Sequence, residues 1–211
     1  MSILNPIYAE NEIKEDVTKI MIAPRINCTD NIIKLWKILF EDAPSVIKST
    51  VCSSSLCQVF LRALPVVSAN HSIISRQGFT ALEKALQFYH KIYNVRCRFC
   101  NKAIATRFTV PKEYLFIELD IRDNSTTKKV KMCRLSDLPI HLNLKLNSDD
   151  GSEINLRFRL SGVAAYVTGH YFAYCRRLGG NWVTYNDMSA KPESAPAHVD
   201  VQPHGAFYIL E

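Results

Sequence analysis

A histidine, a side-chain amide and a carboxylate come close together in the last quarter of the chain. His170 precedes a glycine-rich turn at residues 178–181, and Asn186 and Asp187 follow that turn. We expect a β-hairpin here, in which opposed residues share one face with Cβ atoms about 4.5–5.5 Å apart. Counting outward from the turn places His170 opposite Asn186 or Asp187.

This hairpin provides what a general base needs. Asn186 or Asp187 would hold one ring nitrogen of His170, which leaves the other nitrogen to take a proton from a nucleophile. The alternative is an ordinary histidine that is hydrogen-bonded within a strand. Both interpretations remain open from the hairpin alone.

Four cysteines form two close pairs, Cys52 with Cys57 and Cys97 with Cys100. A zinc ion binds four thiolates in a tetrahedron at about 2.3 Å, and short loops between two cysteines present both sulfurs to one metal. We expect the two pairs to lie on separate hairpin-like arms that meet at the metal. The alternative is a set of buried thiols without a ligand, which are common in proteins.

The elements that must position these residues change type along the chain. Apolar residues spaced for one helical face predict helices over 30–42, capped at residue 29 or 30, and over 79–93, where Thr80 and Glu83 would form a capping box. Later segments alternate with a period of two, which predicts a largely antiparallel sheet and an α+β fold. The expected strands are 113–121, 140–146, 154–160, 163–167, 171–176, 182–185 and 206–210.

Composition narrows the class of protein. The chain has 211 residues, of which 47% are hydrophobic and 22% charged, and this excludes a disordered or coiled-coil protein. Its net charge of +6 is not concentrated in any one segment of the sequence, so we expect no nucleic-acid partner. We also expect no membrane partner, because no apolar segment approaches the ~20 residues that span a bilayer. Seven cysteines without a secretory signal favour a reducing, intracellular compartment such as cytoplasm or nucleus.

The hairpin sequence closely resembles the histidine box of the ubiquitin-specific protease (USP) family, papain-like cysteine peptidases that cleave ubiquitin from proteins. The shared pattern is Gly-His-Tyr-x-Ala-Tyr-Cys-Arg from Gly169, then a glycine turn and Trp-x-x-Tyr-Asn-Asp from Trp182. The second cysteine pair is similar to half of the zinc site in the family's fingers. The resemblance covers about residues 30–211 and leaves 1–29 unassigned.

The resemblance implies a fold and a set of roles. The fold would be a single but partial domain shaped as a hand of fingers, palm and thumb, with structural zinc bound by the four paired cysteines. His170 would be the general base that deprotonates a cysteine, Asn186 would orient the imidazole, and Asp187 would be an adjacent polar support. Ubiquitin, or a ubiquitin-like protein, and its conjugates would be the partners.

The nucleophile is where the chain departs from the family. The family's cysteine box reads roughly Gly-Asn-Thr-Cys-Tyr-x-Asn-Ser, and no segment matches it. Cys28 is the candidate nucleophile because it precedes the first expected helix, although Ala23 stands where the family has an upstream Asn. A second alignment sets residues 29–52 after the cysteine box, in which case the front of the catalytic domain is absent from this chain.

Two functions therefore compete, and a third has little support. The first is a thiol-dependent deubiquitinase (ubiquitin isopeptidase) domain, which would be inactive if it is a fragment. The alternative is a non-catalytic ubiquitin-binding pseudoenzyme, or an isopeptidase for a ubiquitin-like modifier. A basic zinc module for nucleic acid rests on the net charge alone, because the sequence shows no platform of interleaved aromatic and basic residues.

Overall fold

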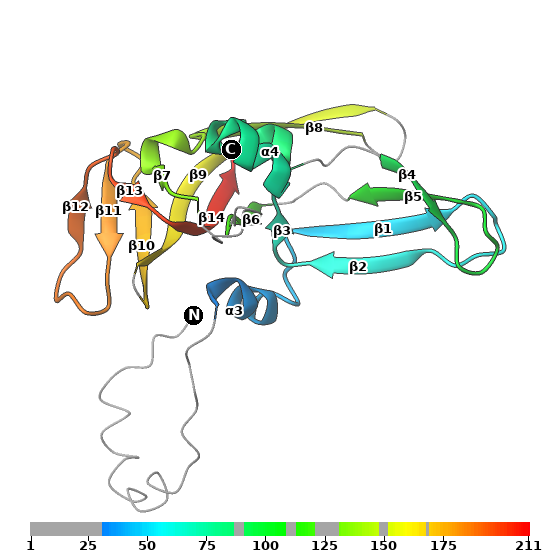
Figure 1. Cartoon of the computed structure of the whole chain (residues 1–211), viewed down its shortest axis with the longest axis horizontal. Helices are drawn as coiled ribbons and strands as arrows, with labels where there is room; N and C mark the ends of the chain where they lie inside the picture. Colours follow the sequence, from blue (N-terminus) through cyan, green and yellow to red (C-terminus); the bar gives the residue numbers. More distant parts are fainter. Residues whose placement is uncertain (1–30, 87–90, 109–112, 121–130, 148–151, 168) are drawn as a thin grey trace, which may run out of the picture. The chain divides into compact units, whose positions relative to one another are not determined.

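The computed structural model describes residues 31–86, 91–108, 113–120, 131–147, 152–167 and 169–211. All of them belong to one compact unit, Asn31–Glu211. They form short helices and mainly antiparallel sheets (Figure 1). This arrangement confirms the predicted α+β class.

The larger sheet has eight strands. They are β3 (Val67–Ser68), β6 (Tyr114–Glu118), β8 (His141–Asn147), β9 (Glu153–Val167), β10 (His170–Arg176), β11 (Trp182–Tyr185), β12 (Glu193–Ala195) and β14 (Pro203–Leu210). Their spatial order is β12-β11-β10-β9-β14-β6-β3, and β8 also pairs with β9. Every pairing is antiparallel except that of β3 with β6. The last strand of the chain, β14, therefore lies between β9 and β6.

A separate four-stranded antiparallel sheet has the order β2-β1-β5-β4, and two further short strands form a pair of their own. The four strands are β1 (Val46–Cys52), β2 (Phe60–Leu64), β4 (Lys91–Arg96) and β5 (Ala103–Phe108), and the short pair is β7 (Cys133–Arg134) with β13 (Asp200–Val201). The helices are α3 (Ile32–Leu39), α4 (His71–Gln77) and α5 (Leu82–Ala85), with 3₁₀ turns η1 (Phe79–Ala81) and η2 (Leu135–Asp137). None of the helices in the described ranges has the length and hydropathy that crossing a membrane requires.

One face of the larger sheet carries the main core. Leu115 and Ile117 of β6 and Tyr208 of β14 are fully buried there, with Leu82 of α5 in the same cluster. The buried phenol of Tyr208 donates a hydrogen bond of 2.7 Å to the carbonyl of Pro139. This bond matters because a buried hydroxyl without a partner is costly.

The opposite face of the same sheet holds α3. Because side chains alternate along a strand, Phe116 of β6 and Phe207 of β14 point away from the main core. They form a second cluster with Trp36 and Phe40 of α3, in which the ring centroids of Trp36 and Phe116 are 4.5 Å apart. The aromatic rings thus fix α3 against β6 and β14.

The first predicted helix is shorter than expected. It begins at Ile32, and Asn31 is its N-cap, since the Asn31 side chain accepts a hydrogen bond of 2.8 Å from the amide of Ile33. The predicted cap at residue 29 or 30 is therefore wrong. Asn is as suitable an N-cap as Thr or Asp, because its side chain also accepts a hydrogen bond from a free amide of the first turn. Asn31 also directly precedes Ile32, the first apolar residue of the helix.

The second predicted helix, over 79–93, is wrong in its second half. Helical structure ends after Ala85, and Lys91–Arg96 form β4, which pairs with β5. Residues 91–95 are rich in β-branched and aromatic types, which favour a strand when a partner strand is present. The capping box is also wrong, because the Glu83 carboxylate accepts a hydrogen bond of 2.9 Å from the amide of Asn143 instead.

The predicted strands agree better with the structure. Segments 154–160 and 163–167 are both extended, but they form one continuous strand, β9. Its pairing with β14 shifts between Phe207 and Tyr208, which is a β-bulge. Helix α4, which the sequence analysis did not predict, covers the main core through buried Ile74.

Candidate functional site

The hairpin of β10 and β11 brings the predicted site residues together, but not in the predicted register. His170 opens β10, and the ladder ends where Ala173 faces Tyr185. The expectation that His170 lies opposite Asn186 or Asp187 within the ladder is therefore wrong. Both residues reach His170 from the loop that follows β11.

The turn explains this difference. The amide of Arg177 donates a hydrogen bond of 2.8 Å to the carbonyl of Asn181, and Gly180 has a φ of 90°. Glycine tolerates this left-handed conformation without steric cost. The strand pairing is consequently centred on Gly179, whereas the predicted pairing of His170 with Asn186 or Asp187 needs a centre at residue 178 or just beyond.

The imidazole of His170 contacts two oxygen acceptors through one nitrogen. His170 Nε2 lies 2.8 Å from Asn186 Oδ1 and 3.0 Å from Asp187 Oδ1. The amide orientation of Asn186 is fixed, because the backbone N–H of Met188 donates to Oδ1 at 3.0 Å and Asn186 Nδ2 lies 3.3 Å from Ser189 Oγ. Two acceptors at Nε2 place the proton of the neutral ring there. Within the described residues no hydrogen bond uses Nδ1, so its lone pair is available.

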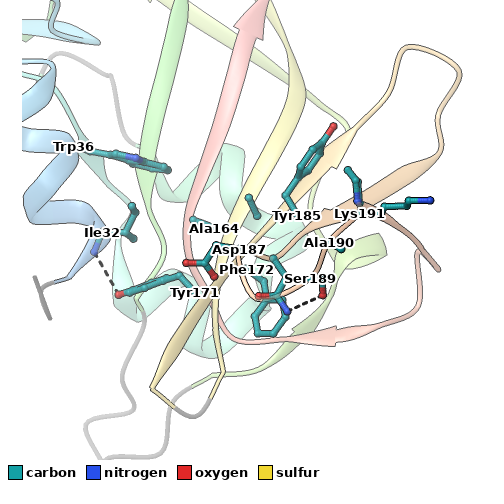
Figure 2. A pocket seen from close by; sticks show the side chains of 13 residues that line it. Ile32, Trp36, Ala164, Tyr171, Phe172, Tyr185, Asp187, Ser189, Ala190 and Lys191 are labelled. Carbon is teal, nitrogen blue, oxygen red and sulfur yellow. Dashed lines mark hydrogen bonds between the residues drawn. The ribbon is translucent and has the colours of Figure 1, made fainter. Parts of the chain in front are cut away.

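A cavity of about 520 Å³ lies beside these residues (Figure 2). Ile32 and Trp36 of α3 and Phe172 of β10 form apolar parts of its wall, while Asn186 and Asp187 contribute polar groups. The histidine is not itself part of the wall, but both of its hydrogen-bond partners are. A ligand in the cavity would therefore contact the residues that hold the imidazole.

A partly buried hydrogen-bond chain connects the start of α3 to the centre of the larger sheet. The amide of Ile32 donates to the hydroxyl of Tyr171 at 3.4 Å, and that hydroxyl lies 2.8 Å from His204 Nδ1. The side-chain amide of Gln202 donates to His204 Nε2 at 2.9 Å. Tyr171 directly follows His170, so this chain ties the α3 wall of the cavity to the strand that carries the histidine.

Gly205 on β14 allows α3 to approach the sheet closely. A Cβ atom at this position would lie 2.7 Å from Cζ3 of Trp36 and 3.1 Å from Cδ1 of Ile33. Real Cβ atoms do not come so near another heavy atom, so only glycine fits without movement. Tyr171, His204 and Gly205 are positioning residues that were not predicted from the sequence. For Gly205 a glycine inside a strand was the available signal, since it often marks a close approach.

Besides the four paired cysteines, the described residues include two more, Cys133 and Cys175. Cys133 on β7 is buried, and burial raises the pKa of its thiol to about 12. Cys175 on β10 is partly buried, and burial raises the pKa of its thiol as well. Neither lines the cavity, and Cys28 lies outside the described residues.

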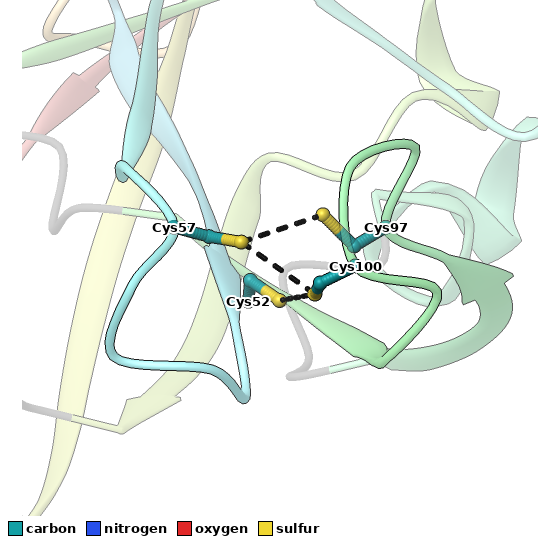
Figure 3. A group of neighbouring side chains, drawn as sticks. All are labelled: Cys52, Cys57, Cys97 and Cys100. Atoms are coloured by element: carbon teal, nitrogen blue, oxygen red, sulfur yellow. Dashed lines mark hydrogen bonds between the residues drawn. The ribbon is translucent and has the colours of Figure 1, made fainter.

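The four paired cysteines meet at one end of the four-stranded sheet (Figure 3). Cys52 ends β1 and Cys57 follows in the loop to β2, while Cys97 and Cys100 lie in the loop between β4 and β5. All four sulfurs lie within 4.8 Å of one another, and the shorter contacts run from 3.3 to 3.9 Å. Tetrahedral binding at about 2.3 Å requires sulfurs about 3.8 Å apart. The donor set therefore fits a metal ion such as zinc.

The surroundings of these thiols shift their pKa values in opposite directions. Backbone N–H groups of Cys100 and Phe99 lower the pKa of the Cys97 thiol to about 7, because they stabilise its thiolate. The hydrogen bond to the Cys100 thiol, together with burial, raises the pKa of Cys57 to about 12. Four thiolates this close repel one another strongly, so a bound cation is what would let all of them ionise together.

Comparison with solved structures shows which known proteins share this fold. One match is a chain of the SAGA Ubp8/Sgf11/Sus1/Sgf73 DUB module bound to ubiquitin aldehyde, with a TM-score of 0.50 and 19% identity over 79% of this chain and 40% of that chain. A chain of the yeast SAGA DUB module matches with a TM-score of 0.50 and 17% identity over 80% of this chain and 40% of that chain. This chain therefore spans less than half the length of the chains that it matches. No protein-family model and no curated protein matches the sequence. The likeness is one of fold: the described residues share the architecture of USP-like deubiquitinase modules.

Proposed function

We propose that this chain is part of a thiol-dependent deubiquitinase of the USP type, with His170 as its general base. The observation that carries the proposal is the 2.8 Å contact between His170 Nε2 and Asn186 Oδ1, which leaves Nδ1 available. The shared fold supports it. The four-stranded sheet would be the fingers of the hand and the larger sheet its palm, within one domain that extends from about residue 30 to the end of the sequence given.

In this proposal the imidazole moves one proton twice. His170 Nδ1 takes the proton of a cysteine thiol, and the thiolate then attacks the carbonyl carbon of the isopeptide bond. The same nitrogen returns the proton to the leaving amine. Asn186 keeps the ring in the plane that these transfers need, and Asp187 provides a second acceptor at Nε2.

Cys28 is the nucleophile that we propose within this chain. It lies four residues before Ile32, whose amide is bonded to Tyr171 next to His170. Its place in the sequence just before α3 is the support for this choice. The competing proposal is that the nucleophile belongs to a preceding segment of a longer protein.

Hydrolysis of a fluorogenic ubiquitin C-terminal amide tests the enzymatic proposal. We expect thiol-dependent release of the fluorophore, its loss in His170→Ala, and its loss in Cys28→Ala if Cys28 is the nucleophile. Lys84→Ala is the matched control, because this side chain is exposed on α5 and remote in sequence from the hairpin. Activity that persists in His170→Ala would refute the role of the imidazole.

A non-catalytic ubiquitin-binding module is the second candidate. It is favoured by one observation: among the described residues, no thiol lines the cavity. Calorimetric titration with ubiquitin should then show binding without turnover. If no binding is detected at about 1 mM ubiquitin, the binding free energy is weaker than about 4 kcal/mol. That result would argue against both candidates.

We further propose that the four-cysteine cluster binds structural zinc. The ion would link the β1–β2 loop to the β4–β5 loop and would take no part in proton transfer. Elemental analysis should find one zinc per chain, and Cys97→Ser should lower that content. Freshly purified chain without any zinc would contradict this assignment.

A further inference from the structure

The four-stranded sheet concentrates the positive charge of the chain. Its two hairpins, residues 46–64 and 91–108, hold seven of the 26 Lys and Arg residues and none of the 20 Asp and Glu residues. The remainder is close to neutral, with 19 basic against 20 acidic residues. The two hairpins are separate in sequence, and they come together only because β1 pairs with β5 (Figure 1).

Two of these charges face each other directly. Lys48 on β1 lies opposite Arg62 on β2 in the strand register. Like charges at directly opposed positions destabilise a sheet, and no ion pair between described residues involves either side chain. The repulsion between Lys48 and Arg62 would be offset by an anion bound across both side chains, because each would then contact a negative charge.

Two exposed aromatic rings accompany the charge. Phe60 on β2 and Phe99, which lies between Cys97 and Cys100, are 53% and 79% exposed. Their ring planes are within 7° of parallel, with centroids 6.3 Å apart. Phe60 is two residues from Arg62 along β2, so the alternation of a strand places its side chain on the same face as Arg62.

We infer that this face of the four-stranded sheet binds single-stranded nucleic acid. Lys48 and Arg62 would contact phosphates, and bases would stack on Phe60 and Phe99. Basic grooves with exposed aromatic rings bind single strands in this way, because every base offers a flat π-face. An acidic polypeptide would match the charge but has no regular flat groups for two parallel rings.

This inference revises an expectation from the sequence and is independent of the proposed deubiquitinase function. From the sequence alone we expected no nucleic-acid partner, on the ground that no single segment concentrates charge. Residues 91–108 alone hold five of the seven basic residues, and their pairing with the hairpin of residues 46–64 adds Lys48 and Arg62 and brings Phe99 beside Phe60. Failure of ubiquitin binding or hydrolysis would leave it unaffected.

Titration of the zinc-loaded chain into a labelled oligo(dT) of about 12 nucleotides, followed by fluorescence anisotropy, tests the role of charge. We expect binding with a Kd of about 10⁻⁶–10⁻⁴ M that weakens between about 50 and 200 mM salt. The double variant Lys48→Gln with Arg62→Gln should reduce the slope of log K against log salt by about 1.4, or 0.7 per charge. Lys84→Gln with Lys145→Gln removes the same net charge elsewhere and should leave the slope unchanged.

The aromatic platform needs its own variants. Phe60→Ala and Phe99→Ala should each weaken binding about fivefold or more. Leu178→Ala is the matched control, since Leu178 is as exposed but lies in the β10–β11 turn. Phe99→Leu keeps the apolar bulk and removes the flat ring, so it should weaken binding even if an alanine variant folds poorly; thermal melting and zinc content report folding.

Three results would overturn the inference. The first is no binding of oligo(dT) at about 0.1 mM protein and low salt. The second is that the control variant, Lys84→Gln with Lys145→Gln, changes the salt slope as much as Lys48→Gln with Arg62→Gln does. The third is polyglutamate binding as tightly as oligo(dT), with the phenylalanine variants unchanged, because that would assign the face to an acidic protein.

Discussion

The side chain of Asn186 has each of its polar atoms engaged. Its Oδ1 contacts His170 Nε2 and accepts from the amide of Met188, while its Nδ2 lies near Ser189 Oγ. A carbonyl oxygen fixed by a backbone donor cannot rotate away from the imidazole without breaking two hydrogen bonds. The tautomer of His170 is therefore imposed by the loop after β11 and does not depend on a ligand.

Replacing this amide should impair the proposed chemistry through orientation alone. Asn186→Ala should lower kcat about 10²–10³-fold with little change in KM, because the imidazole loses the acceptor that holds it. Asn186→Asp should retain much of the activity, since a carboxylate oxygen can occupy the same place. Steady-state kinetics on the ubiquitin amide measures both, and Ser189→Ala is the control for loosening of the loop. An Asn186→Ala variant with wild-type kcat would contradict this role.

The buried thiol of Cys133 should make stability depend on pH in the alkaline range. Its pKa rises from 9.0 to about 12, mainly through burial and also through the carboxylates of Asp137 and Asp200. The unfolded chain then loses the proton first as pH rises, so folding stability falls between about pH 9 and 12, by at most about 1.4 kcal/mol per pH unit. Below pH 9 the thiol is protonated in both states and contributes no slope.

Urea denaturation at several alkaline pH values measures this effect. The difference in unfolding free energy between the wild type and Cys133→Ala should shrink as pH rises through this window. Val201→Ala, which truncates the strand partner of Cys133, should cost stability by an amount that does not vary with pH. Parallel pH profiles for the wild type and Cys133→Ala would show that the thiol does not titrate differently in the two states.

At the level of elements, α3 depends on the absence of a side chain in β14. Gly205→Ala would place a Cβ atom 2.7 Å from the Trp36 ring. We expect a loss of about 1–3 kcal/mol in unfolding free energy, as overpacking typically costs. Urea titration followed by tryptophan fluorescence measures it. Trp36→Phe in the same chain should restore part of the loss because the smaller ring leaves room, whereas Gly179→Ala, with open space around it, should have little effect.

The strands of the larger sheet were predictable because their periodicity is strong. Period-two alternation identified β6, β8 and the first part of β9, and the further strand candidates agree with β10, β11 and β14, with 182–185 matching β11 at both ends. Burial on one face of a sheet imposes this alternation directly. The same information does not give register, since one extra residue in a turn moves the pairing, as the turn at Gly180 shows.

The segment 79–93 shows why helices were less predictable. Its first residues do pack through a helical face, with Phe79, Leu82 and Ala85 buried in the main core. Its last residues form β4, because β5 offers backbone partners from a part of the chain that local periodicity does not report. Tertiary pairing decides such segments. The N-cap of α3 differs from its prediction for a simpler reason, as Asn31 was an equally good cap next to the predicted ones.

At the scale of the whole molecule, the candidate site combines residues that the sequence reveals and residues that it hides. The hairpin sequence indicated His170, Asn186 and Asp187, because all three lie within one local motif. It gave no reason to single out Tyr171 or His204, whose bond joins strands that are distant in the chain. Such long-range contacts follow from the strand order, which is not encoded locally.

The two sheets should respond differently to removal of the metal. If zinc links the two loops, chelation should speed hydrogen exchange of backbone amides in residues 46–64 and 91–108, while β9 and β14 remain protected. Mass spectrometry of exchanged peptides measures both regions in one experiment. Cys97→Ser should reproduce the effect of the chelator, and Cys175→Ser on β10 should not alter exchange in the four-stranded sheet. Equal loosening of both sheets would contradict a local role for the metal.

The position of β14 has a consequence for biosynthesis. This strand, Pro203–Leu210, separates β9 from β6, although β6 is made about 90 residues earlier. A nascent chain on the ribosome therefore carries β6 and its apolar side chains with one edge uncovered until Leu210 has emerged from the exit tunnel. Edges of this kind recruit other chains. We expect nascent forms of this protein that stop before residue 203 to associate with chaperones or to aggregate, and release of the complete strand to end that exposure.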